Sequence, residues 1–225
     1  VGGHLARQLR EFLATLTHNQ RKALRRSTRL LSEAGTLEFR VVTDPGAVPT
    51  ELDRLIELNR RVWRERGLPG SFPDDASRRF HHRLARAPAD RGELFLGALW
   101  LNDTHLASAY GFDYEGVLYF YVISVGPSPV PKAGIGRVLI GMSIKEAVER
   151  QCLEFDQLRG DEAYKYDWTS RDRRILSVLF YNGRIRTFLY LLLRTARDYV
   201  KHLIKAVISK RPAARSDGGR QPDKP

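Results

Sequence analysis

The sequence predicts an α/β (α+β) protein whose mixed, mostly antiparallel sheet is flanked by helices. Three strand-like segments follow one another closely, at 93–101, 105–114 and 117–125. The turns between them, Asn102-Asp103 and Glu115-Gly116, are so short that these strands must be antiparallel neighbours. Behind them, a glycine loop, a helix and a short strand form a crossover unit, which adds a parallel pair.

The remaining elements follow from hydrophobic periodicity. Alternation of apolar and polar residues predicts a strand over 37–42, with a turn at Asp44-Pro45-Gly46. Apolar residues spaced by three or four predict helices over 5–32, 50–66, 74–87, 137–150 and 185–208. We expect Thr50 to cap the second helix, and two further strands at 153–156 and 175–181.

Composition divides the chain into four parts. We expect a helical segment over 1–34, a domain over 35–183, a basic amphipathic helix over 184–210 and a disordered tail over 211–225, which lacks large apolar residues. Cys152 is the only cysteine, so neither an intrachain disulfide nor a thiolate metal cluster can form. Because residues 1–10 also lack a secretory pattern, we expect a cytoplasmic protein, peripheral to the inner membrane face if the helix binds lipid.

The net charge of +12 is concentrated at the two ends of the chain. Residues 1–34 carry seven basic and two acidic groups, and residues 171–225 carry fourteen and four, whereas the middle is slightly acidic. This distribution argues against a nucleic-acid-binding domain. In the 184–210 helix the longest uncharged run is far shorter than the roughly 20 residues of a membrane span. The helix either lies on an anionic membrane surface or packs on a protein domain.

Two segments carry candidate chemistry. Gly134 and Gly136 open a helix directly after a strand, so free amide N–H groups and the helix dipole would favour a diphosphate, although a plain turn also explains them. Residues 155–168 place several carboxylates among basic and aromatic residues at the carboxyl end of a strand, where ligands bind in α/β sheets. A charge-paired turn is the alternative. Adjacent His81 and His82 suggest surface residues rather than metal ligands, and His105 is expected to be exposed, so no metal is expected.

These segments resemble the CelD-like (cellulose-biosynthesis) acetyltransferase domain of the GNAT superfamily. The resemblance covers about residues 21–168 and includes the strand 107–112, the run Tyr119-Phe120-Tyr121, the glycine loop and, most specifically, residues 155–165 (FDQLRGDEAYK). It implies a GNAT fold and transfer of an acyl group from acetyl-CoA or another acyl-CoA. The acceptor would be a polysaccharide, a glycolipid or another envelope-related saccharide or amine.

The same resemblance implies roles for individual residues. Donor binding would fall to Val125, Lys132, Gly134, Ile135, Gly136 and Arg137. Tyr164 would be the general acid, with Asp156 or Glu162 as the base if burial raises its pKa. Substrate binding would involve Arg159, Lys165 and Tyr121. The sequence departs from the family at Pro131, where Gln or Arg is usual, and at Gln157, where relatives often have an aromatic residue.

Two other functions are open on the sequence. A Fem-like aminoacyltransferase shares the GNAT architecture and takes aminoacyl-tRNA, which would explain the basic ends. A nonenzymatic accessory protein would combine a degenerate donor site with a helix that docks on a membrane or a partner.

Overall fold

The computed structural model describes residues 2–169, 171–176, 178, 180 and 185–209, which form two compact units divided after Arg173. The first unit holds the whole sheet. Its elements are α1 (Gly2–Thr15), α2 (His18–Ala34), β1 (Leu37–Val41), η1 (Pro45–Ala47), α3 (Val48–Glu65), α4 (Asp75–Asp90), β2 (Leu94–Leu101), β3 (Thr104–Tyr114), β4 (Val117–Val125), α5 (Ile135–Glu149), β5 (Glu154–Asp156) and η2 (Ala163–Asp167). The second unit contains α6 (Ile185–Ser209).

The five strands form one sheet in the order β1-β2-β3-β4-β5. The first four are antiparallel and β5 runs parallel to β4, which confirms the predicted mixed sheet. The predicted short turns are present, and Asn102 and Glu115 both adopt positive φ, at 52° and 51°. That conformation matches the twist of two-residue hairpin turns.

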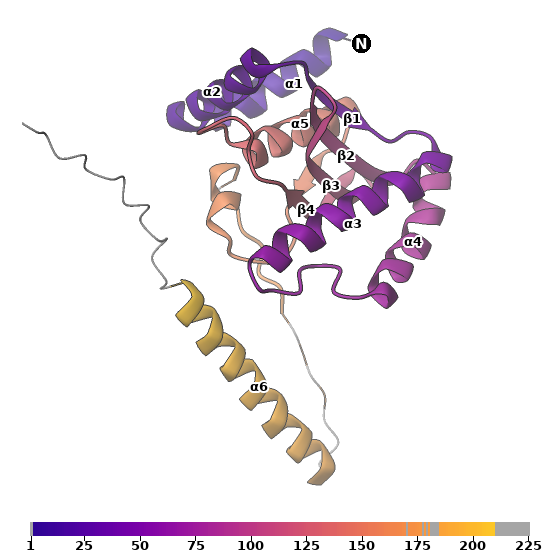
Figure 1. The fold of residues 1–225 in the computed structure, drawn as a ribbon, viewed down its shortest axis with the longest axis vertical. Helices are drawn as coiled ribbons and strands as arrows, with labels where there is room; N and C mark the ends of the chain where they lie inside the picture. The colour runs from indigo at the N-terminus through magenta and orange to yellow at the C-terminus, as the bar shows by residue number, and fades with distance from the viewer. Residues whose placement is uncertain (1, 170, 177, 179, 181–184, 210–225) are drawn as a thin grey trace, which may run out of the picture. The chain divides into compact units, whose positions relative to one another are not determined.

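Helices cover both faces of the sheet (Figure 1). On one face, α3 and α4 enclose a core that contains Leu52, Leu55, Phe72 and Tyr110. On the other face, α5 lies against the sheet and α1 and α2 pack against α5, in a core that includes Leu139. Each large apolar side chain buried in this way contributes about 1.5–3 kcal/mol.

The predicted single helix over 5–32 is wrong, because the chain breaks between α1 and α2. Thr17 adopts an extended conformation and its hydroxyl accepts from the amide of Gln20 at 3.3 Å, while the Gln20 side chain accepts from the amide of Thr17 at 2.7 Å. This reciprocal capping box stabilises a new helix start. The apolar spacing continues across the break because both helices bury one face in the same core as α5.

Two smaller expectations also fail. The helix expected from Thr50 begins at Val48, since Pro49 occupies the first turn, where a missing N–H costs nothing. The strand expected over 175–181 is absent at the described positions 175, 176, 178 and 180, while 177, 179 and 181 lie outside the described residues. The predicted tail over 211–225 also lies outside them.

Candidate acetyl-transfer site

The sheet opens between β4 and β5. β5 pairs with β4 only at Val117, Leu118 and Tyr119, so the described structure places no strand beside the rest of β4 on that edge. At the same point the register with β3 shifts, because Tyr110 faces Val122 while Gly111 faces Phe120. Tyr121 is the extra residue of this bulge. The main-chain groups that follow are therefore available to an extended ligand.

A cavity of about 210 Å³ lies at this opening. Five of the predicted site residues line it, namely Tyr121, Arg159, Glu162, Tyr164 and Lys165, together with Phe120, Ile123, Gln157 and Leu158. Residues from β4 thus meet residues from the loop after β5, as expected for the carboxyl end of a strand. Gln157 stands out in the sequence only as a departure from the family pattern. In the structure its buried Oε1 has no protein hydrogen-bond partner among the described residues.

Hydrogen bonds fix the loop that forms the far wall of the cavity. Asp156 Oδ1 accepts from the amide of Leu158 at 2.7 Å. Lys165 Nζ donates to the carbonyl of Arg159 at 2.9 Å and pairs with Glu162 Oε2 at 2.9 Å. The carboxylate of Asp156 and the ammonium group of Lys165 are both engaged in these contacts. Both side chains therefore stabilise the conformation of the loop.

The protonation of two cavity residues follows from these contacts. Burial works to raise the pKa of Glu162, but the hydrogen bond from Lys165 and its positive charge outweigh burial and leave the pKa lowered. We expect Glu162 to act as the base only if burial raises its pKa. Its pKa is lowered, so Glu162 does not meet this condition. Burial, followed by the charge of Glu162, raises the pKa of Tyr164. Tyr164 is thus a protonated phenol near neutral pH.

The glycine loop leads into α5 as predicted. The first helical hydrogen bond runs from Val138 N to Gly134 O at 3.1 Å, so the amides of Gly136 and Arg137 precede the helical ladder. A Cβ built on Gly136 would meet only Val125 Cγ2, at 3.5 Å. The loop therefore leaves open space at Gly136, beside the last residue of β4.

Other predicted donor residues have protein partners. Gly134 N donates to the buried Oγ of Ser27 on α2, at 3.1 Å, and Arg137 Nη2 donates to Asp167 Oδ2 at 3.0 Å. The side chain of Ile135 is buried in the core, so only its main chain can contribute to a site. Lys132 is exposed, with φ at 62°.

The histidines differ from expectation. His81 is not a surface residue, since it is 4% exposed among Phe72, Phe80, Tyr110 and Tyr121. Its position follows from the helical turn, which directs one of two adjacent residues inward. His105 is only half-buried rather than exposed, and its Nε2 lies 2.6 Å from Ser108 Oγ.

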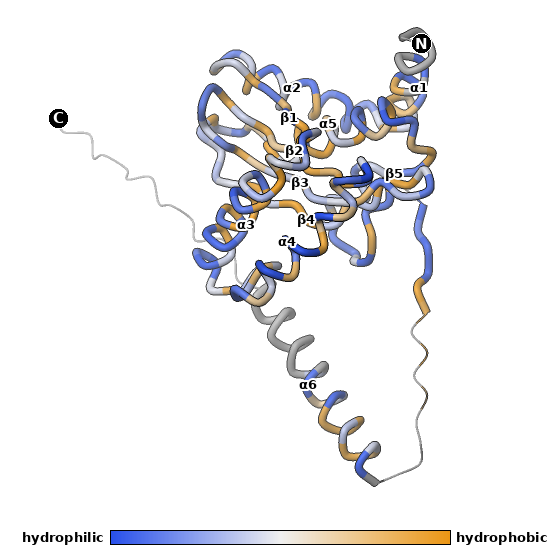
Figure 2. Tube along the Cα trace, turned by 90° about the vertical axis from the view of Figure 1, so that its right-hand side faces the viewer, coloured by the Kyte–Doolittle hydropathy of each residue, from blue (hydrophilic) through white to orange (hydrophobic). Residues whose placement is uncertain are grey.

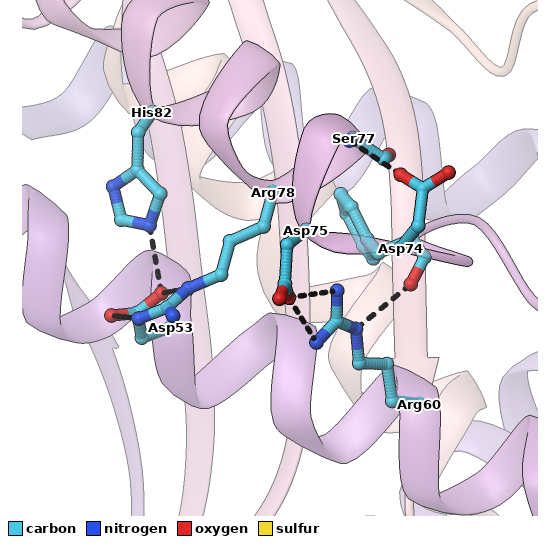
Figure 3. A network of polar contacts seen from close by, with 8 residues as sticks. Asp53, Arg60, Asp74, Asp75, Ser77, Arg78 and His82 are labelled. Atoms are coloured by element: carbon cyan, nitrogen blue, oxygen red, sulfur yellow. Dashed lines mark hydrogen bonds and ion pairs between the residues drawn. The ribbon is translucent and has the colours of Figure 1, made fainter.

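His82 belongs to a polar network between α3 and α4 (Figure 3). Its Nε2 lies 2.7 Å from Asp53 Oδ1, and Arg78 donates to both oxygens of the same carboxylate. Arg60 joins the following loop and the start of α4, through the carbonyl of Phe72 and the carboxylate of Asp75. The network positions α4 on α3, and with it His81. In the described part of the chain, no three His, Cys, Asp or Glu residues gather as metal ligands would.

Comparison with known proteins shows the family. The profile described as "Acetyltransferase (GNAT) domain" matches residues 18–166, which is more than half of the chain. No curated protein sequence matches the chain. Acetyl-CoA as the acetyl donor fits this family match.

Several solved acetyltransferases are similar in structure. An aminoglycoside acetyltransferase from an uncultured soil metagenomic sample, in complex with sisomicin, is 14% identical with a TM-score of 0.44, and covers 65% of this chain and 97% of its own. The aminoglycoside N-acetyltransferase AAC(6')-Iy in complex with CoA is 18% identical with a TM-score of 0.44, and covers 66% and 95%. By the family match, this chain belongs to the acetyltransferase (GNAT) domain family and is an acetyltransferase.

Proposed function

We propose that the chain transfers an acetyl group from acetyl-CoA to an amine or hydroxyl of a saccharide-containing acceptor, as the CelD-like members of the family would. A polysaccharide, a glycolipid or another envelope-related molecule is the acceptor class. The single observation that carries the proposal is the stretch of β4 that no described strand pairs on the β5 side. It runs from the cavity residues Tyr121 and Ile123 to Val125, which lies beside Gly136.

The donor would lie along β4. The amides of Gly136 and Arg137 bind its diphosphate, aided by the helix dipole of α5. The pantetheine arm pairs with the main chain between Phe120 and Val125, where no strand of the described structure competes. The unpaired Oε1 of Gln157 accepts from an amide of that arm. The thioester then reaches the cavity.

In the cavity the acceptor nitrogen or oxygen attacks the thioester carbon. The new C–N or C–O bond forms as the C–S bond breaks, and the acceptor atom gives up one proton to a base. A main-chain N–H stabilises the oxyanion. The sulfur leaves with the electron pair and takes a proton from Tyr164, the phenol that lines the cavity. Arg159, on the same wall, contacts the acceptor.

Titration calorimetry with acetyl-CoA and desulfo-CoA tests the donor, and thiol release with glucosamine as acceptor tests the reaction. A chain that binds no acyl-CoA but binds tRNA in a salt-sensitive manner would instead support the Fem-like alternative.

Tyr164→Phe removes the proton that the leaving thiolate needs. We expect kcat for acetyl transfer to fall by roughly 10²-fold, within the range of general acid catalysis, with little change in the KM for acetyl-CoA. Tyr166→Phe is the matched control, since Tyr166 lies on the same short helix but does not line the cavity. Equal rates for wild type and Tyr164→Phe would remove Tyr164 from the mechanism.

We also propose that residues 184–210 bind an anionic membrane surface. Phe188, Leu192 and Leu193 of α6 are exposed, and Figure 2 shows polar and apolar residues interspersed along its described part. Among the described residues no helix is both long and apolar enough to cross a bilayer. Basic residues between exposed apolar ones suit the interface of an anionic bilayer.

Deletion of residues 184–225 tests the membrane proposal. We expect the full chain to sediment with phosphatidylglycerol vesicles at low salt, and the shortened chain to stay in solution. Phosphatidylcholine vesicles are the control, because they lack the negative surface charge. Equal sedimentation of both chains would show that the helix is not the membrane-binding element.

A further inference from the structure

Two buried polar atoms on the α4 side of β4 have no hydrogen-bond partner among the residues that the structure describes. They are Nδ1 of His81 and the hydroxyl of Tyr110, and they belong to side chains that are 4% and 0% exposed. A buried polar atom without a hydrogen bond costs about 1–3 kcal/mol, so native proteins leave few of them without a purpose. Two such atoms in neighbouring rings point to a ligand that completes them.

The two atoms lie next to the candidate site. The rings of His81 and Tyr110 are 5.8 Å apart, and each is also 5.8 Å from the ring of Tyr121. Tyr121 is the bulge residue of β4 and lines the 210 Å³ cavity. Tyr121 therefore packs near both rings and also lines the space proposed for the thioester.

Two exposed aromatic side chains pack on the imidazole of His81. Tyr121 is 45% exposed and Phe80 is 57% exposed, and both rings pack on the imidazole. Turning one exposed aromatic side chain is a local motion that leaves the core intact. His81 itself is held on α4, which the network around Asp53 fixes to α3.

The protonation states of His81 and Tyr110 indicate which class of ligand the two residues can bind. Burial, and then the nearby charge of His82, lower the pKa of His81, so its imidazole is neutral and one ring nitrogen can accept a hydrogen bond. Burial raises the pKa of Tyr110, so its phenol keeps its proton and can donate. An acceptor and a donor on two neighbouring rings match a hydroxyl or a neutral amine, since each of these groups both donates and accepts a hydrogen bond.

We propose that His81 and Tyr110 form the acceptor subsite, where they hold the attacking hydroxyl or amine after Tyr121 turns aside. The inference rests on the proposed acetyl transfer and names the face from which the acceptor enters. The donor lies along the free edge of β4, and the acceptor reaches the thioester from the side of α4. His81 Nδ1 accepts the hydrogen of the nucleophile, and takes its proton as the new bond to the acetyl carbon forms.

The variants Tyr110→Phe and His81→Phe test the subsite, since both keep an aromatic ring of similar size. With glucosamine as the acceptor, we expect each to raise the acceptor KM by about 10-fold, the value of one or two hydrogen bonds. His81→Phe should lower kcat as well, because it also removes the group that takes the proton of the nucleophile. The dissociation constant of acetyl-CoA should not change. Because Tyr110→Phe removes an unpaired hydroxyl, its melting temperature should equal or exceed that of the wild type. Tyr114→Phe, on the exposed end of β3, is the control.

A second measurement needs no turnover. In the CoA-bound protein with ¹⁵N-labelled histidine, glucosamine should shift the ring resonances of His81, and the shift should shrink in Tyr110→Phe. If the wild-type protein does not bind acetyl-CoA, the proposed function itself is overturned. If the wild type binds acetyl-CoA normally, but His81 does not respond to glucosamine and both variants keep the wild-type KM for glucosamine, only the subsite is overturned. A lower melting temperature of Tyr110→Phe with an unchanged KM would show that the pair merely holds a structural water, and would equally overturn the subsite.

Discussion

Gly136→Trp is expected to abolish acetyl-CoA binding while the chain stays folded. The open space at Gly136, where an added Cβ would touch only Val125 at an ordinary distance, accommodates a side chain without disturbing the core. An indole there would occupy the place of the diphosphate and screen the amides at the start of α5. Because hydrogen bonds to charged groups contribute about 1.5–3 kcal/mol each, the loss of two predicts affinity at least ~100-fold weaker.

Calorimetric titration with acetyl-CoA measures this effect, and circular dichroism confirms the fold. Lys145→Trp is the matched control, because it adds the same bulk to an exposed position of the same helix. Gly136→Ala should give an intermediate loss. Wild-type affinity in Gly136→Trp would show that the donor binds elsewhere.

Gly111→Ala is expected to destabilise the protein and to remove most of its activity. A Cβ at this position would collide with the carbonyl oxygen of Tyr119, a main-chain atom that cannot move without shifting β4. Overpacking of this kind costs about 1–3 kcal/mol, and more where backbone must give way. The displaced segment carries the bulge at Tyr121, so the cavity changes shape as well.

Urea unfolding and the rate of acetyl transfer report the two effects of Gly111→Ala. Gly97→Ala is a fitting control, since the two atoms nearest to a Cβ there belong to the ring of Phe39, a half-buried side chain that can shift more easily than main chain. If both variants were equally stable and active, the bulge would not depend on glycine.

Local patterns predicted the sheet well. The turn at Asn102 and the turn at Glu115 leave too few residues for anything but hairpins, and the glycine loop before α5 marks the crossover. These signals are strong because sterics decide them over a few residues. The break at Thr17 was missed although its capping box with Gln20 is visible in the sequence, since the apolar spacing runs through it.

Pairing of charged side chains could not be predicted, because it depends on segments that are distant in sequence. Arg137 was assigned to the phosphates, yet its guanidinium meets Asp167, thirty positions further on. Likewise, nothing local to His81 indicates that Phe72, Tyr110 and Tyr121 surround it. The sequence located the cavity wall through residues 155–165, but the aromatic side chains that separate it from His81 emerge only from the packing of α4 on the sheet.

The hydrogen bond from Gly134 to Ser27 ties the glycine loop before α5 to α2, which precedes the first strand. Leu31 of the same helix is fully buried, so α2 shares the core of α5. A shortened chain that starts at residue 35 would expose to water the amide of Gly134 and the apolar face of α5 that packs against α2. The shortest version worth purifying for donor-binding experiments therefore starts at Thr17 or earlier.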